Sequence, residues 1–393
     1  MDKIKTKQII CGLLICLLLF ACYGCGTGSP NGGSIDTDAQ GIQAETRDMT
    51  DLSGRKVTIP AYPCRIAAMT GPSYEMLFML GGKDRIAMTK IGHTTNYPLA
   101  LLTNPDLAHY EGIGANPSSS VNIEDYLRRE VDLVIYYNND NELKKFDAAG
   151  IPAVVPSRSS PLRTLDEIMS QPLDDFIDRS VATVNYLADV LGGESIAKAE
   201  AWTAYCYEKL TMLYERTLNL TDDQLPTVFW GNTWGENILA SYPLGNRCYE
   251  IRLCGGELLA PLGGSGNFPE VTKEQLFDWD PDIILVDNHG NYPELVIESM
   301  YREGSLWESL NAVKNKELHR IPAGVFFLDK GTTTTLMMVW LGTIIQPELF
   351  ADIDIIEEIK YYYREFYEFE LTDEQAQKVV DGWYERVGDE PDL

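Results

Sequence analysis

Polar and aromatic side chains that could bind a small molecule occupy the short loops that follow predicted buried strands. Aromatic rings and amides dominate these loops, and charged side chains are few. Flat rings and amides suit a bulky, partly apolar ligand such as a metal chelate or a macrocycle. The candidate ligand-binding residues are Thr70, Ser73, Tyr74, His93, Tyr97, Tyr136, Tyr137, Asn138, Arg158, Trp230, Asn232, Trp234, Asn288, His289, Phe326 and Phe327.

Members of this set allow two other chemistries. His93 and His289 could each ligate a metal directly or contact the metal of a chelate. A bare zinc or manganese ion needs three or four His, Asp or Glu ligands, and these loops hold too few histidines, so we predict no direct metal site and no resident cofactor. Thr70, Ser73 and Arg158 could hold an oxyanion such as molybdate or tungstate. An anionic ferric chelate would favour several arginines, and only Arg158 is placed to meet one.

Motifs of the common enzyme classes are absent from the sequence. The chain has no G-x-S-x-G, no G-K-[ST] phosphate loop, no H-E-x-x-H and no G-x-G-x-x-G after a predicted strand. We therefore predict a binding protein and not an enzyme. A surface lipoprotein with an enzymatic or adhesive role is the alternative from another class.

The elements that must position these residues form an α/β protein of two wound lobes bridged by one long helix. Residues 194–218 contain neither Gly nor Pro. They predict a helix of nearly 40 Å, which suits a rigid strut between the lobes. The predicted strands are 65–69, 85–89, 132–136, 152–155, 227–230, 283–286 and 319–322, behind a hairpin at 45–61. The main predicted helices are 74–80, 122–129, 142–149, one or two within 162–191, and then 194–218, 249–255, 334–345, 353–367 and 372–386.

One helix–strand unit occurs twice, about 150 residues apart. Residues 121–135 and 271–285 each begin with Val, carry a Glu (Glu124, Glu274), and place an Asp eight residues later before three β-formers. A short helix that leads into a buried strand has this pattern. The repeat indicates two lobes of similar build, although chance similarity is an alternative because only three positions are identical.

The first 21 residues have the features of a secretory signal. Three lysines precede an uncharged apolar stretch at 9–21 that is short for a membrane span. Residues 19–22, Leu-Phe-Ala-Cys, resemble the lipobox of bacterial lipoproteins, so we predict lipidation of Cys22, with Cys25 as the alternative and an ordinary signal peptide as the competing interpretation. The chain divides into a signal peptide (1–21), a flexible tether (22–48), an N-terminal lobe (49–193), a connecting helix (194–219) and a C-terminal lobe with a helical end (220–393).

The formal net charge is −27, and it becomes −29 without the first 21 residues, which hold three lysines and one aspartate. This acidity excludes nucleic acid as a partner, because phosphate binding needs a basic face. Four of the eight cysteines lie beyond the predicted tether, and these four show no C-x-x-C spacing. Whether Cys248 and Cys254 pair stays open at this point.

Five motifs between residues 49 and 386 resemble the iron-chelate and vitamin B12 type of periplasmic binding protein, the solute-binding component of an ABC importer. The first, D-L-S-G-R-K-V-T-I-P, is similar to the family's opening D-x-x-G-R-x-V-x-I-P. The resemblance implies two lobes bridged by one long helix, with the ligand between them and little hinge motion. The other motifs are at 65–82 (with P-S-Y-E-M-L), 255–256 (Gly-Gly), 306–322 (with L-N-A-V-K-N) and 340–350 (W-L and P-E-L-F).

The resemblance also implies partners and a location. A monomer, anchored by lipid on the extracytoplasmic side of the cell membrane, would capture an iron chelate (siderophore or haem) or a corrinoid and deliver it to an ABC permease dimer with its ATPase. In this family each lobe presents an acidic residue to arginines of the permease. Glu124 and Glu274 are the candidates because they are equivalent in the repeated unit, and Glu75 and Glu257 are their competitors. An oxyanion remains the alternative ligand.

Overall fold

The computed structural model describes most of the chain after the predicted tether, and the described residues belong to one compact unit. The predicted signal peptide and most of the tether, with Cys22 and Cys25, lie outside the described residues. No helix within the described part of the chain is long and apolar enough to cross a membrane. The described residues are 45–90, 96–109, 121–157, 164–234, 237–240, 245–261, 268–288 and 292–385.

A two-stranded hairpin opens the described chain. Strands β1 (Thr46–Thr50) and β2 (Lys56–Pro60) pair antiparallel around a turn in which Gly54 has a φ of +92°. The buried carboxylate of Asp51 accepts N–H groups of this turn and, at 3.2 Å, the N–H of Val155 at the edge of the first sheet. The hairpin predicted from the sequence is confirmed, and Asp51 fastens it to the N-terminal lobe.

The first lobe contains a four-stranded, fully parallel sheet in the order β4-β3-β5-β6. Its strands are short and almost completely buried, as expected for a parallel sheet with helices on both faces. The strands are β3 (Ile66–Ala68), β4 (Ile86–Thr89), β5 (Leu133–Ile135) and β6 (Ala153–Val154), and the helical elements are α1 (Ser73–Met79), η1 (Lys83–Arg85), α3 (Pro98–Thr103), η2 (Pro105–His109), α4 (Ile123–Arg128), α5 (Asp140–Ala149), α6 (Leu165–Met169) and α7 (Leu173–Leu191).

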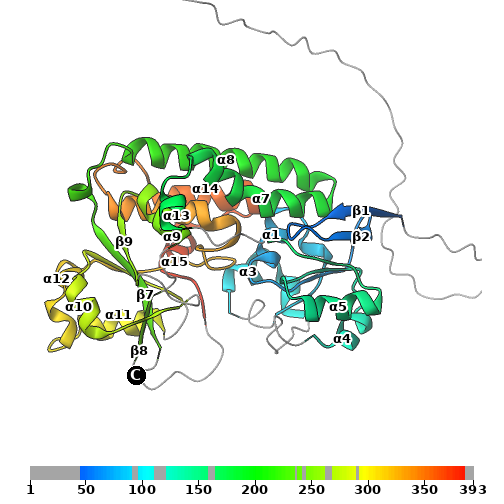
Figure 1. Cartoon of the computed structure of the whole chain (residues 1–393), viewed down its shortest axis with the longest axis horizontal. Coiled ribbons are helices and arrows are strands. Elements are labelled where there is room, and N and C mark those ends of the chain that lie inside the picture. The colour runs from blue at the N-terminus through cyan, green and yellow to red at the C-terminus, as the bar shows by residue number, and fades with distance from the viewer. Residues whose placement is uncertain are drawn as a thin grey trace, which may run out of the picture. The chain divides into compact units, whose positions relative to one another are not determined.

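One long helix, α8 (Glu194–Thr217), connects the lobes. Its 24 residues correspond to a length of about 36 Å. Buried residues recur on one face, among them Ala199, Cys206 and Leu213, and this face packs on α7 and α13. Figure 1 shows α8 alongside α7, with α13 and α14 beneath it. The helix predicted for 194–218 is confirmed.

The second lobe has a mixed sheet in the order β10-β8-β7-β11-β12, with β9 also paired to β7. The β7, β9, β11 and β12 pairings are parallel, and the β7–β8 and β8–β10 pairings are antiparallel. Its elements are β7 (Thr227–Trp234), β8 (Asn237–Ala240), β9 (Glu257–Leu259), β10 (Glu270–Val271), β11 (Ile283–Val286) and β12 (Leu318–Arg320), with η3 (Asp222–Gln224), α9 (Asn246–Leu253), α10 (Lys273–Trp279), α11 (Pro293–Tyr301), η4 (Leu306–Ser309) and α12 (Asn311–Asn315).

Strand β7 corrects one prediction. The sequence predicted a strand that ends at Trp230 and a loop through Trp234, but β7 continues to Trp234 and pairs antiparallel with β8. The prediction ended the strand before Gly231, because glycine usually marks a turn. Here a Cβ on Gly231 would collide with the Leu239 carbonyl of β8, so the glycine permits close strand contact.

The helical C-terminal end follows the second sheet. It consists of η5 (Gly331–Thr333), α13 (Thr334–Ile345), α14 (Ile355–Tyr367) and α15 (Asp373–Val380). The predicted capping box of Thr372 with Gln375 is present. Helix α15 is shorter than the predicted 372–386, because Gly382 at φ +79° turns the chain. Residues 383–385 then reach the first lobe, where the Glu385 N–H donates to the Asn96 carbonyl at 2.8 Å.

A shared hydrophobic core lies between the lobes. The largest buried cluster includes Tyr74 of α1, Trp202 of α8, Val228 of β7, Trp340 of α13 and Tyr362 of α14. Each of these side chains is at most 4% exposed. Because elements of both lobes and the C-terminal helices pack into one core, opening the lobes would expose apolar surface.

The repeated helix–strand unit is confirmed. Helix α4 leads into β5 and helix α10 into β11. In both units the residue two before the Asp has a positive φ, at Glu130 (51°) and Asp280 (40°). Asp132 then accepts the Arg65 N–H before β3, and Asp282 accepts the N–H at the start of β7. The same device therefore aligns the first two central strands of each lobe.

Candidate functional site

The carboxyl ends of β3 and β5 in the first lobe, and of β7 and β11 in the second, carry most of the predicted ligand-binding residues that the structure describes. Ligands of wound sheets bind at such ends. His93, Arg158 and His289 lie outside the described residues, and Trp234 is described only through its place in β7. Among the described residues, no group of three or more His, Cys, Asp or Glu could hold a metal ion.

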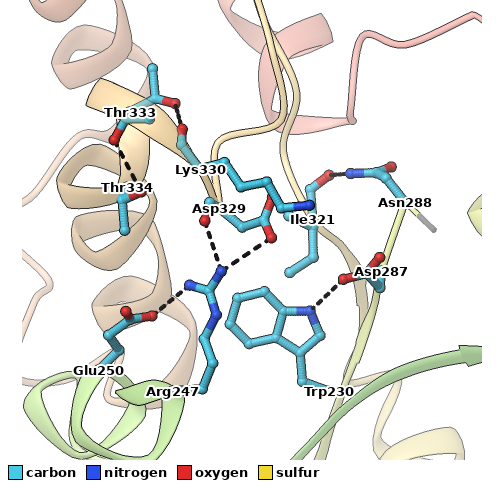
Figure 2. Close-up of polar contacts among 11 residues, drawn as sticks. Trp230, Arg247, Glu250, Asp287, Asn288, Ile321, Asp329, Lys330, Thr333 and Thr334 are labelled. Atoms are coloured by element: carbon cyan, nitrogen blue, oxygen red, sulfur yellow. Dashed lines mark hydrogen bonds and ion pairs between the residues drawn. The ribbon is translucent and has the colours of Figure 1, made fainter. Parts of the chain in front are cut away.

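An ionic cluster that the sequence did not predict lies in the second lobe. Arg247, on the first turn of α9, donates to Glu250 at 2.5 Å and to the Asp329 carboxylate at 3.1 Å and carbonyl at 2.7 Å. Figure 2 shows the guanidinium held between the two acidic side chains. Asp329 is only 4% exposed. Burial raises the pKa of Glu250, and the adjacent Arg247 opposes that rise.

Trp230 forms one wall of this cluster. Its ring lies 4.5 Å from the Arg247 guanidinium carbon, a cation–π contact, and its indole N–H donates to the buried Asp287 carboxylate at 3.2 Å. The Lys330 side chain extends toward Asp287 and Asn288 (Figure 2). Within the described residues, the cluster therefore places Arg247 between the carboxylates of Glu250 and Asp329, with Trp230 between Arg247 and the carboxylate of Asp287.

The predicted amide ligands Asn232 and Asn288 are buried and bonded within the protein. The Asn232 side chain donates to the Asp287 carbonyl. The Asn288 side chain donates to the Ile321 carbonyl at 2.9 Å and accepts from Arg320 at 3.2 Å. These bonds hold the end of β11 against its neighbouring strands.

The predicted residues after β3 form the start of α1. The Ser73 hydroxyl is buried and donates to the Thr70 carbonyl at 2.8 Å, while Thr70 itself is partly exposed. Tyr74 is completely buried, and its hydroxyl donates to the Val325 carbonyl. Burial raises the pKa of Tyr74 well above its ordinary value. In this structure Tyr74 links α1 to the 323–328 segment.

Four aromatic side chains form a cluster around that segment. The Tyr97 ring lies 5.1 Å from Phe326, 5.3 Å from Phe327 and 5.0 Å from Tyr384. Tyr97, Phe326 and Phe327 are each at most 7% exposed. The sequence predicted these three as ligand-binding residues and missed Tyr384, because the predicted last helix hid the reversal of the chain at Gly382.

The residues after β5 differ in exposure. Tyr136 is buried and packs edge-on against Phe146, whereas Tyr137 is half-buried and Asn138 is exposed. Burial raises the pKa of Tyr137, while the Gly71 backbone N–H and the nearby Lys330 act in the opposite direction. Tyr137 of the first lobe and Lys330 of the 329–331 segment therefore lie near one another at the site.

A cavity of about 320 Å³ borders the ionic cluster. This volume lies within the range of small-molecule sites. It is lined by Pro72, which precedes α1, and by residues of α7, α8, α9, α13 and the 329–331 segment, among them Phe176, Trp202, Arg247, Asp329 and Lys330.

Glu75 lies on α1 and is completely buried. It lies beside the 329–331 segment, which lines this cavity. Its carboxylate accepts the Thr332 N–H at 3.1 Å and the hydroxyls of Thr332 and Tyr367. Burial raises the pKa of Glu75 to about 7, and these three donors oppose the rise. A side chain with no exposed surface cannot reach a permease, so Glu75 is excluded as the competitor of Glu124.

A family model described as periplasmic binding protein matches residues 66–324, more than half of the chain. The chain belongs to the periplasmic binding protein family. This confirms the family predicted from the motifs. The protein is thus an extracytoplasmic solute-binding component of an ABC importer and not an enzyme.

Two relatives of this periplasmic binding protein cover most of its length. The molybdate-binding protein MolA of Haemophilus influenzae is 25% identical over 82% of this chain and 91% of the relative. The iron(3+)-hydroxamate-binding protein FhuD of Bacillus subtilis is 24% identical over 82% of this chain and 93% of the relative. Among solved structures, MolA bound to molybdate matches with a TM-score of 0.69 and 21% identity, over 83% of this chain and 99% of that one, which establishes the shared fold.

The two predicted docking residues of this periplasmic binding protein occupy equivalent positions. Glu124 and Glu274 are exposed, and each is the second residue of its helix, behind the side-chain caps Asn122 and Thr272. Glu257, the remaining competitor in the second lobe, is also exposed, on β9. Exposure therefore keeps three of the four acidic candidates available to a partner.

The four cysteines that the structure describes take no part in the candidate site. Cys248 and Cys254 are buried and free, one within α9 and the other directly after it. Cys206 is also buried and free, and Cys64 is exposed and free. In this structure Cys248 and Cys254 therefore do not form the pair that the sequence left open.

Sequence reasoning missed Arg247, Glu250, Asp329 and Lys330. The spacing of Arg247 and Glu250 by three residues on a helix was a readable signal for an ion pair. Nothing in the local sequence indicated that Asp329, more than 80 residues away, would complete it. These residues, with Trp230 and Tyr137, now define the candidate site.

Proposed function

We propose that the solute of this importer component is a neutral or cationic ferric chelate of the hydroxamate type, held between the two lobes. The single observation that carries the proposal is the charge balance of the ionic cluster. Arg247 is already bonded to two carboxylates, those of Glu250 and Asp329, so its charge is balanced within the protein.

An anionic solute would have to compete with these carboxylates for Arg247. Replacing a buried, bonded carboxylate leaves that carboxylate desolvated without its partner, which costs several kcal/mol. A neutral or cationic chelate meets no such penalty. Its apolar parts could contact aromatic surface such as the half-buried Tyr137. The similarity to FhuD, whose name assigns it an iron(3+)-hydroxamate, supports the same ligand class.

A tetrahedral oxyanion such as molybdate is the second candidate. The similarity to MolA favours it. The Gly71 N–H, the Tyr137 hydroxyl and Lys330 lie near one another at the lobe junction, and hydrogen-bond donors with one cation suit a small oxyanion. Arg158, the cation expected to meet an anion, lies outside the described residues.

Delivery to the permease would use the two repeated units. Glu124 and Glu274 present carboxylates from equivalent positions on the two lobes, which fits a partner made of two similar subunits. Lipidation at Cys22, or at Cys25, would hold the protein at the extracytoplasmic surface of the membrane. The test is ATPase stimulation of the cognate transporter in vesicles, which Glu124→Ala and Glu274→Ala should each reduce and exposed Glu298→Ala should not.

A tryptophan-fluorescence titration tests the ligand class. The protein without residues 1–21 would be titrated with ferric desferrioxamine B, ferrichrome, haem, cobalamin, a ferric catecholate and molybdate. We expect saturable quenching by a hydroxamate chelate, which Trp230→Phe diminishes. A response to molybdate alone would establish the oxyanion instead, and silence across the panel would refute both ligands.

A further inference from the structure

Glu75 holds a segment that also carries two residues of the candidate site. The Thr332 N–H and hydroxyl both donate to the Glu75 carboxylate, with the Tyr367 hydroxyl as the third donor. Asp329 and Lys330 lie only three and two residues before Thr332. A change at Glu75 can therefore reach the site through a very short length of chain.

The segment has little freedom to compensate. The Thr332 carbonyl accepts the Trp202 indole N–H at 3.1 Å and the Tyr362 hydroxyl at 2.8 Å. Gly331 has a φ of +73°, and a Cβ there would collide with the Glu75 carboxylate. Residues 329–332 are thus fastened at one end by Arg247 and at the other by Glu75.

We propose that Glu75 is a positioning residue for the solute site, whose ionised carboxylate keeps Asp329 and Lys330 in place, so that acidification loosens the segment and weakens solute binding. The inference rests on the proposed solute site between the lobes. It adds a residue that does not touch the solute and a dependence on pH.

Among the described residues, the titratable groups that face Glu75 leave it as the group that changes charge near neutral pH. They are Tyr74 of its own helix and Tyr362, Tyr363 and Tyr367 of α14, and burial raises the pKa of each. Asp329 and Lys330 lie farther along the segment. Glu250, whose pKa burial also raises, is the competing group on the far side of Asp329.

The direction follows from the hydrogen bonds. The ionised Glu75 accepts all three donors in charge-assisted hydrogen bonds, whereas the protonated acid donates its own proton, so one hydroxyl must turn to accept it and the remaining bonds lose their charge assistance. The pKa of Glu75 is about 7, so the segment is held more firmly above pH 7 than below it. Solute affinity should therefore fall as the pH decreases.

The first experiment needs no solute. The Trp202 indole N–H reports on Thr332, so its NMR resonance, assigned with Trp202→Phe, would be followed from pH 5 to 9 in the protein lacking only residues 1–21. We expect a transition near pH 7 that Glu75→Gln abolishes. The matched control is Glu358→Gln on α14, which removes a carboxylate bonded to Tyr205 and Lys209 and should keep the transition. A transition that persists in Glu75→Gln would overturn the inference and implicate Glu250.

The second experiment measures affinity for ferric desferrioxamine B and for molybdate at pH 8 and pH 5.5. For the probe that binds, we expect about fivefold weaker binding by the wild type at pH 5.5. Glu75→Gln should bind weakly at both pH values, and Glu358→Gln should follow the wild type. Equal pH dependence in wild type and Glu75→Gln would refute the inference, whereas absence of binding to any probe would refute the proposed function and leave the NMR result to decide this one.

A milder variant protects the test against misfolding. Tyr367→Phe removes one of the three donors but keeps the ring in the core. The donor stabilises the ionised form, so its loss should move the Trp202 transition to higher pH. An unchanged midpoint would count against Glu75 as the titrating group.

Discussion

Two buried carboxylates fasten the ends of the 329–332 segment in different ways. Asp329 is paired with a cation, Arg247, while the partners of Glu75 within the described part of the chain are an N–H and two hydroxyl groups. An ion pair balances the charge of a buried carboxylate, whereas neutral donors satisfy its oxygens and leave the cost of desolvating the charge. The comparison teaches that an ion pair holds one end of the segment, whereas the hold on the other end depends on the protonation state of Glu75 and therefore on pH.

The largest expected effect comes from removing the cation. Arg247→Met leaves Glu250 and Asp329 buried without their partner, which should lower the free energy of unfolding by about 3–5 kcal/mol. Urea denaturation at pH 7 measures the change. A loss below about 1 kcal/mol would mean that the pair contributes no more than a surface ion pair, and the contrast with Glu75 would disappear.

The next effect concerns Glu75, whose charge is held by neutral donors, and it depends on pH. Burial penalises the charge of Glu75 and raises its pKa from 4.5 to about 7, so its contribution to the free energy of unfolding is present below pH 4.5 and is lost as the pH rises through 7. That loss corresponds to about 3 kcal/mol. This global effect is separate from the local hydrogen bonds, which the three donors make more strongly to the ionised carboxylate. Glu75→Gln removes the titration, so its stability relative to the wild type should improve between pH 5 and pH 8.5. Parallel stability curves for the two proteins would contradict this.

A smaller effect tests one of the neutral hydrogen-bond donors to Glu75. Tyr367→Phe removes a hydrogen bond to a carboxylate that is ionised only above neutral pH. We expect it to destabilise the protein by about 1.5 kcal/mol more at pH 8.5 than at pH 5. Thermal denaturation at the two pH values provides the measurement, and Tyr363→Phe, which loses a bond to the Val325 N–H instead, is the matched control.

The smallest effect is expected for an exposed ion pair on the same helix as Arg247. Arg252 lies 3.8 Å from Asp222, whose side chain is 99% exposed. Arg252→Met should change the free energy of unfolding by less than about 0.5 kcal/mol. A loss comparable to that of Arg247→Met would show that α9 tolerates no loss of charge, and burial would not explain the difference between the two arginines.

Much of the fold was predictable because local patterns are strong where burial is regular. The absence of Gly and Pro from 194–218 predicted α8, and the repeated Glu-to-Asp unit predicted a helix and strand in each lobe. The continuation of β7 past Gly231 was missed, because pairing with β8 is a nonlocal interaction that outweighs the local preference of glycine. The predicted last helix was too long, because the prediction did not take Gly382 as a position where the helix ends.

The candidate site was predictable in place but not in detail. The sequence placed it at the carboxyl ends of the central strands, and the family match supports a solute-binding protein. Tyr74, Tyr97, Phe326 and Phe327 were chosen as aromatic loop residues, and in the structure they are buried against one another and the 323–328 segment. Their direct contact with a solute stays a prediction.

The sequence by itself determined the family, the two α/β lobes and the long connecting helix, because motif order and hydrophobic periodicity are properties of the chain read locally. Only the tertiary structure decided which charges meet. Arg247 and Asp329 are separated by 82 residues, and Glu75 and Thr332 by 257. The cost of burying a charge depends on what folding places beside it, and no local pattern contains that information.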